Sequence, residues 1–226
     1  MSGFKAILFD CDGVVLDSEG MGCGSLGMAV TEAGRPMSLH EARDTFSGNS
    51  ANDTRSWMAA EGFDADSLFK RADEILFEMF ERDVPLMPGI EHVLRDFSLK
   101  KAICSNSSIK RLDLSVARTS VAPFFAGYIY SAEHVAEAKP APDIALHACA
   151  ALGVLPGEAI FIDDNVAGIA CARAAGCLAV GFIGHSDDRE NHDRTLLAAG
   201  ADHVVYGMGE FHALLRTLTS DKREVA

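Results

Sequence analysis

Short apolar runs alternate with longer amphipathic stretches over most of this chain, and polar residues end the runs. The clearest run is residues 4–9, with the sequence FKAILF, and Asp10 follows it directly. A short apolar run of this kind predicts a strand that is buried on both faces. We expect further strands at residues 101–104, 159–162, 178–182 and 203–206.

Stretches of helical length lie between these runs, and several end at a glycine, as helices often do. The expected helices cover residues 88–97, 107–119, 142–152, 166–175 and 191–199. Strands that alternate with helices predict an α/β fold, with a Rossmann-like parallel sheet covered by helices on both faces. Ligands bind to such sheets beyond the carboxyl ends of the strands. We therefore expect the polar residues that follow three of the strands to meet at one edge.

Residues 17–83 interrupt this alternation. They contain no convincing strand, and we expect helices at about 18–33, 38–45, 50–61 and 65–82. Pro85 and Pro88 mark the return to the sheet pattern. The sequence thus predicts a catalytic core formed by residues 1–16 and 84–226, and an inserted all-helical cap domain formed by residues 17–83. Because the insertion leaves the core just after the first strand, we expect the cap to lie over the edge where the polar residues meet.

Composition limits the class of protein and its partners. The chain has 226 residues, of which 48% are hydrophobic and 23% charged, an ordinary balance for a globular protein. Its formal net charge of −13 argues against nucleic acid and membranes as partners, because basic patches bind both. Six cysteines without a C-x-x-C pair are expected to be reduced thiols. Without a signal-peptide pattern or an apolar run of about 20 residues, we expect a cytoplasmic protein, as a monomer or homodimer.

The first candidate catalytic residues follow the first expected strand. Asp10 and Asp12 are carboxylates separated by one residue in a loop, so both can face one side and bind a hard divalent cation. They can also divide the roles of nucleophile and general acid/base. By itself, such a pair is explained at least as well by two solvated turn residues. Cys11 is expected to turn away from both, because side chains alternate along an extended chain.

Two further groups favour a phosphate site. Ser105 and Asn106 follow the second expected strand, where a hydroxyl and free backbone N–H groups suit a phosphate oxygen, although a plain helix N-cap explains them equally well. Lys139 stands directly before a proline, so its ammonium group is expected to be held in place. Asp163 and Asp164 add carboxylates for a metal ion. A cation among four aspartates, together with Lys139, would let this acidic chain accept an anionic substrate.

In this order, the blocks resemble the haloacid dehalogenase-like superfamily of phosphatases, most closely its beta-phosphoglucomutase-like branch with a helical cap. The blocks are residues 9–19 (FDCDGVVLDSE), 104–107 (CSNS), 139–144 (KPAPDI), 162–168 (IDDNVAG) and 174–176 (AAG). Each block is only modestly specific, but the ordered set spans nearly the whole chain and is very hard to obtain by chance.

The resemblance implies a Mg²⁺-dependent phosphohydrolase that acts on a small phosphorylated metabolite, such as a sugar or sugar-acid phosphate. Asp10 would attack phosphorus and form an aspartyl-phosphate, while Asp12 would protonate the leaving oxygen and later deprotonate the attacking water. The implied metal ligands are Asp10, Asp12 through its backbone carbonyl, Asp164 and, directly or nearby, Asp163. The candidate residues for holding phosphate or substrate are Cys11, Gly13, Gly48, Asn49, Ser105, Asn106 and Lys139.

The cap departs from that branch at one position. The mutases of the branch carry an arginine shortly after the segment that corresponds to residues 46–48, and Ala51 stands there in this chain. The difference favours a phosphatase over a phosphomutase, although a nearby basic residue could substitute: Arg43, Arg55, Lys70 or Arg71. A non-catalytic phosphate-binding protein is the remaining alternative, and it would be expected to have lost part of the set.

Overall fold

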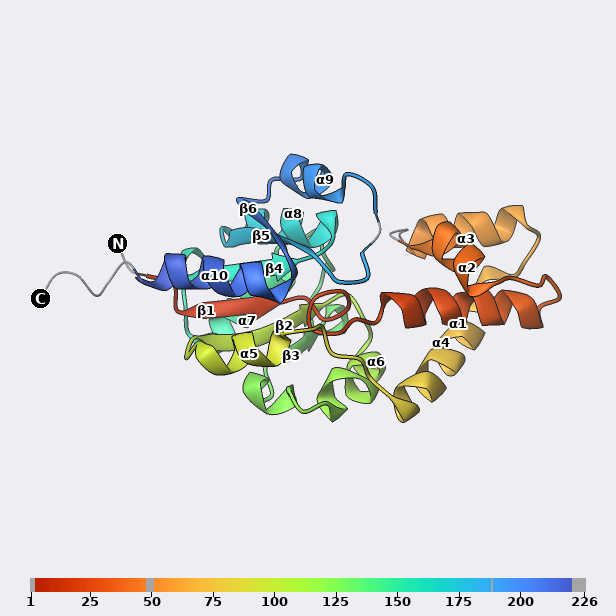
Figure 1. Ribbon diagram of the computed structural model, residues 1–226, viewed down its shortest axis with the longest axis horizontal. Helices are drawn as coiled ribbons and strands as arrows, with labels where there is room; N and C mark the ends of the chain where they lie inside the picture. Colours follow the sequence, from red (N-terminus) through yellow and green to blue (C-terminus); the bar gives the residue numbers. More distant parts are fainter. Residues whose placement is uncertain (1–2, 48–50, 188, 221–226) are drawn as a thin grey trace, which may run out of the picture. The chain divides into compact units, whose positions relative to one another are not determined.

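The computed structural model describes residues 3–47, 51–187 and 189–220. The chain divides into two compact units, one formed by Met1–Asp17 with Pro85–Ala226 and the other by Ser18–Val84 (Figure 1). In the described residues, the first unit contains strands and helices and the second contains helices alone. The predicted fold class, an α/β core with an inserted helical unit, is therefore confirmed.

The described part of the α/β unit is built on a six-stranded parallel sheet in the order β3-β2-β1-β4-β5-β6. The strands are β1 (Ala6–Phe9), β2 (Lys100–Ser105), β3 (Ile129–Ser131), β4 (Ala159–Asp163), β5 (Leu178–Ile183) and β6 (His203–Tyr206). The central strand β1 pairs with β2 and β4, and Phe9 lies opposite Ile103 and Ile162. All four side chains of β1 are buried, which explains its continuous apolar run. This strand ends immediately before Asp10, at the middle of the carboxyl edge.

Helices cover both faces of the sheet. They are α5 (Ile90–Asp96), α6 (Ile109–Leu114), α7 (Asp143–Leu152), α8 (Val166–Ala175), α9 (His192–Ala198) and α10 (Gly207–Ser220), with short 3₁₀ turns η1 (Val116–Arg118), η2 (Ala122–Phe125), η3 (Ala132–His134) and η4 (Pro156–Glu158). On one face, Phe9 makes edge-to-face contacts with Phe125 and Phe211, with ring centroids 5.9 and 6.1 Å apart. Leu8 points to the opposite face and packs in one cluster with Ile144 of α7.

The structure adds two elements that the apolar pattern does not predict, β3 and α10. Strand β3 has only three residues, and two of them are half-buried, so it forms no recognisable apolar run. The helix expected at residues 107–119 is divided into α6 and η1. The division lies at Ser115, whose backbone angles, φ −112° and ψ −101°, are outside the helical region.

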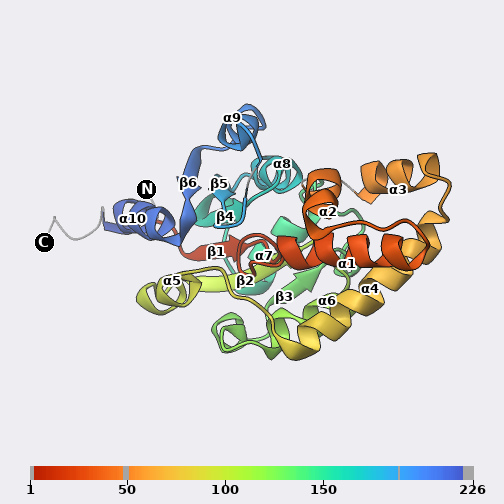
Figure 2. The same ribbon diagram turned by 45° about the vertical axis from the view of Figure 1, so that its right-hand side comes forward.

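The second unit is a helical bundle with its own apolar core. Its helices are α1 (Glu19–Glu32), α2 (Leu39–Phe46), α3 (Ala51–Ala60) and α4 (Ala65–Arg82), and α1 and α4 lie side by side (Figure 2). Trp57 of α3 packs edge-to-face on Phe46 of α2, with ring centroids 5.0 Å apart. Gly27 lets α1 and α2 approach closely, since a Cβ there would lie 2.7 Å from the Cβ of Ala42. The unit therefore packs around side chains from all of its described helices.

The cysteines are structural side chains in this fold. All six are free and buried, as the sequence predicts for reduced thiols. Burial raises the pKa of the Cys104 thiol well above its usual value, so this cysteine is a packed side chain rather than a reactive one. Within the described residues, no helix has the length and apolar character needed to cross a membrane.

Candidate active site

A buried ion-pair cluster surrounds Asp10 at the end of β1. The backbone N–H of Asp10 donates to the carbonyl of Ile162 at 2.9 Å, so the sheet itself fixes the position of Asp10. The Nζ atom of Lys139 lies 2.6 Å from Oδ1 of Asp10 and 2.8 Å from Oδ2 of Asp163. The side chains of Lys139 and Asp163 are 5% and 1% exposed. Water therefore screens these charges weakly.

The electrostatics of this cluster keep Lys139 charged. Burial raises the pKa of Asp10 well above its usual value; Lys139 counteracts this rise, and Asp163 and Asp164 reinforce it. Burial alone would lower the pKa of Lys139, but the attraction of Asp10 and Asp163 raises it overall. The ammonium group therefore stays protonated at neutral pH and provides a fixed positive charge beside Asp10.

Asn106 holds the backbone that carries Lys139. Its Oδ1 accepts a hydrogen bond from the backbone N–H of Lys139, and its Nδ2 donates to the backbone carbonyl of the same residue, both at 3.0 Å. The sequence places Asn106 among the phosphate contacts. In the structure its side-chain amide pairs with the Lys139 peptide groups and so positions the lysine, while its contact with phosphate stays a prediction.

Ser105 is the last residue of β2 and is 2% exposed. Its hydroxyl oxygen accepts a hydrogen bond from the backbone N–H of Ser107 at 3.1 Å. The loop that follows is fixed from the next strand as well, because the hydroxyl of Ser131 donates to the carbonyl of Ser107 at 2.6 Å. The parallel sheet thus brings Asp10, Ser105 and Asp163 to one edge, as the strand pattern predicts.

Asp12 has two partners that the sequence does not reveal. The hydroxyl of Ser107 donates to its Oδ2 at 2.8 Å, and Nη2 of Arg111 donates to its Oδ1 at 2.9 Å. The side chains of Asp12 and Arg111 are 26% and 24% exposed, so this pair is more open to water than the Lys139 cluster. These donors fix the direction of the Asp12 carboxylate.

The loop after β1 depends on a glycine. Gly13 has a φ of +80°, and a Cβ there would lie 2.6 Å from Oδ2 of Asp164, closer than atoms can approach. This glycine therefore allows the Asp164 carboxylate to sit against the loop. Cys11 is fully buried, and burial, reinforced by Asp12 and Asp10, raises the pKa of its thiol. Any contact between Cys11 and a phosphate group would therefore involve its backbone.

Carboxylate oxygens suited to a hard cation gather at this edge. Asp10, Asp163 and Asp164 each place one oxygen within 4.8 Å of the others. An all-oxygen donor set of this kind fits Mg²⁺, which prefers carboxylates and water. The Asp12 carboxylate is outside this group because Ser107 and Arg111 engage it, which leaves its backbone carbonyl as the candidate donor.

A glycine also shapes the Asp163 side of the site. A Cβ on Gly168 of α8 would lie 1.7 Å from Oδ2 of Asp163, so only glycine fits beneath this carboxylate. The other oxygen of Asp163, Oδ1, accepts the backbone N–H of Asn165 at 2.8 Å. Both oxygens of Asp163 thus have donors, Lys139 and Asn165, and we interpret Asp163 mainly as the residue that holds Lys139.

A second cation missed by the sequence analysis lies beside Asp164. The Nη2 atom of Arg189, from the connection between β5 and α9, is 2.9 Å from Oδ2 of Asp164. Like Arg111, it is far from its partner along the chain. A lone arginine in a polar connection carries no spacing pattern that would have identified it.

Some candidate residues lie where the structure gives no description. Gly48 and Asn49 lie outside the described residues. Ala51 is the first residue of α3, but its side chain is also outside the description. The proposed substrate contacts of the helical unit therefore remain predictions from the sequence.

A second group of possible metal ligands lies on α5 and α10, and it contains none of the predicted site residues. Nε2 of His212 is 2.9 Å and Nε2 of His92 is 3.4 Å from Oδ2 of Asp96. The two imidazole rings stack with centroids 5.0 Å apart. Because His92 and His212 are distant in the sequence, their spacing could not have indicated this group.

Comparisons with known proteins agree with this geometry. A family model described as haloacid dehalogenase-like hydrolase matches residues 4–176. The chain is 29% identical over 186 residues to Protein SUPPRESSOR OF QUENCHING 1, chloroplastic, of Arabidopsis thaliana, a match that covers 78% of this chain but only 18% of that protein. It is 24% identical over 181 residues to 6-phosphogluconate phosphatase of Escherichia coli K12, covering 78% of this chain and 81% of that enzyme.

A solved structure matches nearly the whole fold. It is a conserved haloacid dehalogenase-like protein of unknown function from Agrobacterium tumefaciens, with a TM-score of 0.83 and 36% sequence identity. The match covers 96% of this chain and 99% of the other. The likeness therefore includes the inserted helical unit as well as the sheet.

Proposed function

Because this chain belongs to the haloacid dehalogenase-like hydrolases and is a phosphatase of that family, we propose that it hydrolyses small phosphate monoesters with Mg²⁺ through an aspartyl-phosphate on Asp10. The observation that carries the proposal is the buried Asp10–Lys139–Asp163 cluster at the carboxyl edge of the sheet, with the Asp164 carboxylate beside it. A nucleophilic carboxylate, a fixed cation and a set of oxygen donors for a metal ion are the parts that phosphoryl transfer requires.

In the first step, an oxygen of Asp10 attacks phosphorus and the bond between phosphorus and the ester oxygen breaks. Phosphoryl transfer depends mainly on positioning and on neutralising charge that spreads over the phosphoryl oxygens. Lys139 supplies a positive charge 2.6 Å from the nucleophile, and the contacts from Asn106 to its backbone keep it there. The Ser105 hydroxyl, whose oxygen already accepts the Ser107 N–H, can donate its proton to a phosphoryl oxygen.

Asp12 is proposed to move the protons. It gives a proton to the leaving oxygen in the first step and takes one from water in the second. That water attacks phosphorus, and the bond between Asp10 and phosphorus breaks to release inorganic phosphate. Ser107 and Arg111 hold the Asp12 carboxylate in position for both proton transfers.

Asp10, Asp164 and the backbone carbonyl of Asp12 are proposed to hold the Mg²⁺ ion. When bound, the ion lowers the negative charge between Asp10 and an incoming phosphate. The buried Asp10 carboxylate has a raised pKa, and a nearby divalent cation favours its ionised, nucleophilic form. Asp163 is proposed to serve the site through Lys139.

The substrate class is proposed to be sugar or sugar-acid phosphates. The named E. coli relative is a 6-phosphogluconate phosphatase, which supports a phosphorylated sugar acid as the first compound to test. A screen of phosphorylated metabolites with the purified chain, read as release of inorganic phosphate, would identify the preferred ester. A cytoplasmic location is proposed as well, and the six free cysteines support a reducing compartment.

Release of p-nitrophenol from p-nitrophenyl phosphate tests the chemistry. We expect hydrolysis that needs Mg²⁺, stops on addition of EDTA and is absent in Asp10→Asn, because an amide oxygen is a poor nucleophile. Asp113→Asn is the matched control, since Asp113 lies on the exposed surface of α6 and its variant should keep wild-type activity. Equal activity in Asp10→Asn and wild type would refute the proposed role of Asp10.

A further inference from the structure

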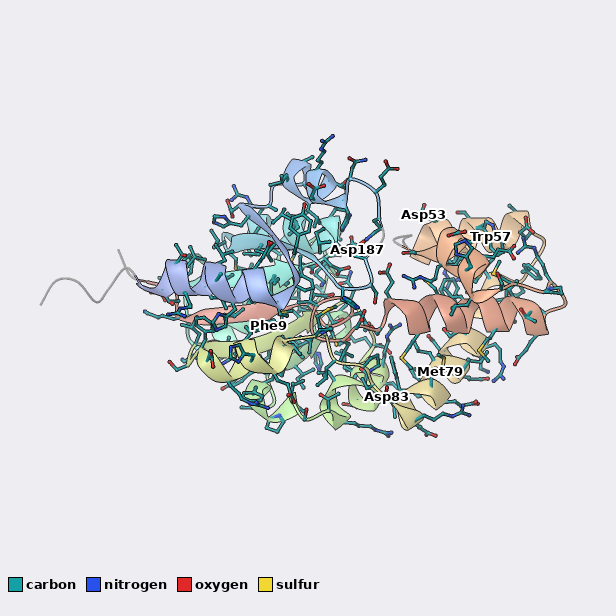
Figure 3. The ribbon with its side chains drawn as sticks, in the orientation of Figure 1. Phe9, Asp53, Trp57, Met79, Asp83 and Asp187 are labelled. Atoms are coloured by element: carbon teal, nitrogen blue, oxygen red, sulfur yellow. The ribbon has the colours of Figure 1, made fainter. Side chains whose placement is uncertain are left out.

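The connection between β5 and α9 reaches the site at Asp164. A Cβ on Gly184, the first residue of this connection, would lie 3.2 Å from the carbonyl oxygen of Gly13, so the connection runs close against the loop after β1. At its other end, Nε2 of His192 lies 2.6 Å from the backbone carbonyl oxygen of Asp164. Figure 3 shows Asp187, in the same connection, beyond the carboxyl ends of the strands. The described residues of this connection, 184–187 and 189–191, therefore form a further wall of the site.

Arg189 links two carboxylates in this wall. Its Nη2 donates to Oδ2 of Asp164 at 2.9 Å and to Oδ2 of Asp187 at 2.7 Å, and its Nε donates to Oδ1 of Asp187 at 2.8 Å. The Asp187 side chain is 3% exposed, and those of Arg189 and Asp164 are each 15% exposed. Two parallel donors on one carboxylate fix a guanidinium in both position and plane.

The pairing with Asp187 determines how strongly Arg189 repels a neighbouring cation. Since Asp187 balances its charge at close range, Arg189 repels a divalent ion much less than an unpaired guanidinium would. Its two bonds to a buried carboxylate also keep it from moving aside. The main effect of Arg189 on the site is therefore a directional hydrogen bond, which holds one oxygen of Asp164 and so sets the orientation of that carboxylate. Outer partners of this kind commonly determine how well a metal ligand is preorganised.

We propose that Asp187 and Arg189 form the outer shell of the metal site, in which Arg189 is a positioning residue that orients the Asp164 carboxylate for Mg²⁺. The proposal rests on the proposed function, because it takes Asp164 as a ligand of the ion. It assigns a role to the β5–α9 connection, which none of the sequence blocks includes.

Isothermal titration of EDTA-treated full-length protein with MgCl₂ tests the proposal without relying on turnover. We expect Arg189→Gln to raise the Kd for Mg²⁺ by about 10- to 100-fold, the usual effect of losing an outer-shell partner. Arg189→Lys, which keeps the charge but loses the paired donors, should give an intermediate Kd. Arg173→Gln is the matched control, because Arg173 pairs with Asp202 on the exposed surface and its loss should leave the Kd unchanged.

A second variant and a second readout keep the test decisive. Asp187→Asn should also raise the Kd, since it removes the anchor of Arg189. At saturating Mg²⁺, the kcat of Arg189→Gln should return to within a few-fold of wild type, which a general loss of structure would not allow. An unchanged Kd in Arg189→Gln would overturn the proposal, and a lower Kd would show that Arg189 competes with the ion. If wild type and Asp164→Asn bind Mg²⁺ equally, the metal site of the proposed function is wrong as well.

Discussion

Replacing Gly168 with alanine should damage the fold and the site together. Gly168 is the third residue of α8 and is buried directly beneath Asp163. An added Cβ would lie 1.7 Å from Oδ2 and 1.8 Å from Cγ of Asp163. Neither atom of Asp163 can move aside freely, because the Asp163 carboxylate accepts hydrogen bonds from Lys139 and Asn165. Relief of the clash therefore requires the carboxylate to turn or the helix to shift.

The expected loss of stability follows from these two costs. Forcing one extra carbon into a packed interior costs about 1–3 kcal/mol. Turning Asp163 away breaks its contact with the Lys139 ammonium, and a hydrogen bond between charged groups is worth about 1.5–3 kcal/mol. Together they predict a loss of about 2.5–6 kcal/mol in the free energy of unfolding. The free energy of unfolding of natural domains is about 5–15 kcal/mol, so a loss of this size removes a large part of the stability.

Denaturant unfolding followed by circular dichroism measures this loss, and hydrolysis of p-nitrophenyl phosphate measures the effect on Lys139. The matched control is Gly209→Ala, because Gly209 is also the third residue of its helix, α10, and a Cβ there meets nothing within 4 Å. That variant should be neutral or more stable by up to about 1 kcal/mol, the helix propensity gained over glycine. If Gly168→Ala were as stable as wild type, the close packing of α8 against Asp163 would be wrong.

Two smaller predictions follow from the hydrogen bonds of the site. Asn106→Ala frees the backbone of Lys139, so kcat should fall by up to about 100-fold, with a smaller change in KM. Misplacing a catalytic group by about 1 Å has an effect of this size. Steady-state kinetics that show no change in kcat would contradict the positioning role of Asn106. Burial alone would raise the pKa of Asp187, but hydrogen bonds from Arg189 lower the pKa overall. The ionised Asp187 therefore contributes stability above its unfolded pKa of about 3.9, and this contribution is lost as the pH falls through the lowered pKa of the folded state. In urea unfolding, Asp187→Asn should therefore lose more stability relative to wild type at pH 7 than at pH 3, and an equal difference at both pH values would exclude this titration.

The sequence predicts the sheet well because a central parallel strand must be apolar on both faces. The run before Asp10 and the run before Asp163 become β1 and β4, which lie side by side at the middle of the sheet. Edge strand β3 is the exception, since it is short and half exposed, so its burial leaves no clear pattern. The same reasoning explains why the meeting of Asp10, Ser105 and Asp163 could be foreseen: parallel strands bring their carboxyl ends together.

The partners of these residues could not be predicted, for a physical reason. Several of the hydrogen bonds that orient site residues join segments that are distant along the chain, as Arg111 and Ser107 do for Asp12. An arginine on a short polar helix looks like any solvated residue until the fold places it. Asn106 illustrates a related case, in which the sequence identifies the residue but not its contacts with Lys139. Its position after β2 suits a phosphate, yet its amide pairs with the peptide groups of Lys139.

The charges of the site show how an acidic chain can accept an anionic ester. Within the described residues, the aspartates of the site are Asp10, Asp12, Asp163, Asp164 and Asp187, and the cations that contact them are Lys139, Arg111 and Arg189. Five carboxylates against three cations leave two negative charges when all are ionised, the charge that one Mg²⁺ ion balances. Without that balance, a phosphate dianion would approach a negative site in a protein whose net charge is −13. The acidity of the chain is thus compatible with phosphate chemistry because three cations offset three of the five carboxylates, and the charge that remains matches one divalent ion.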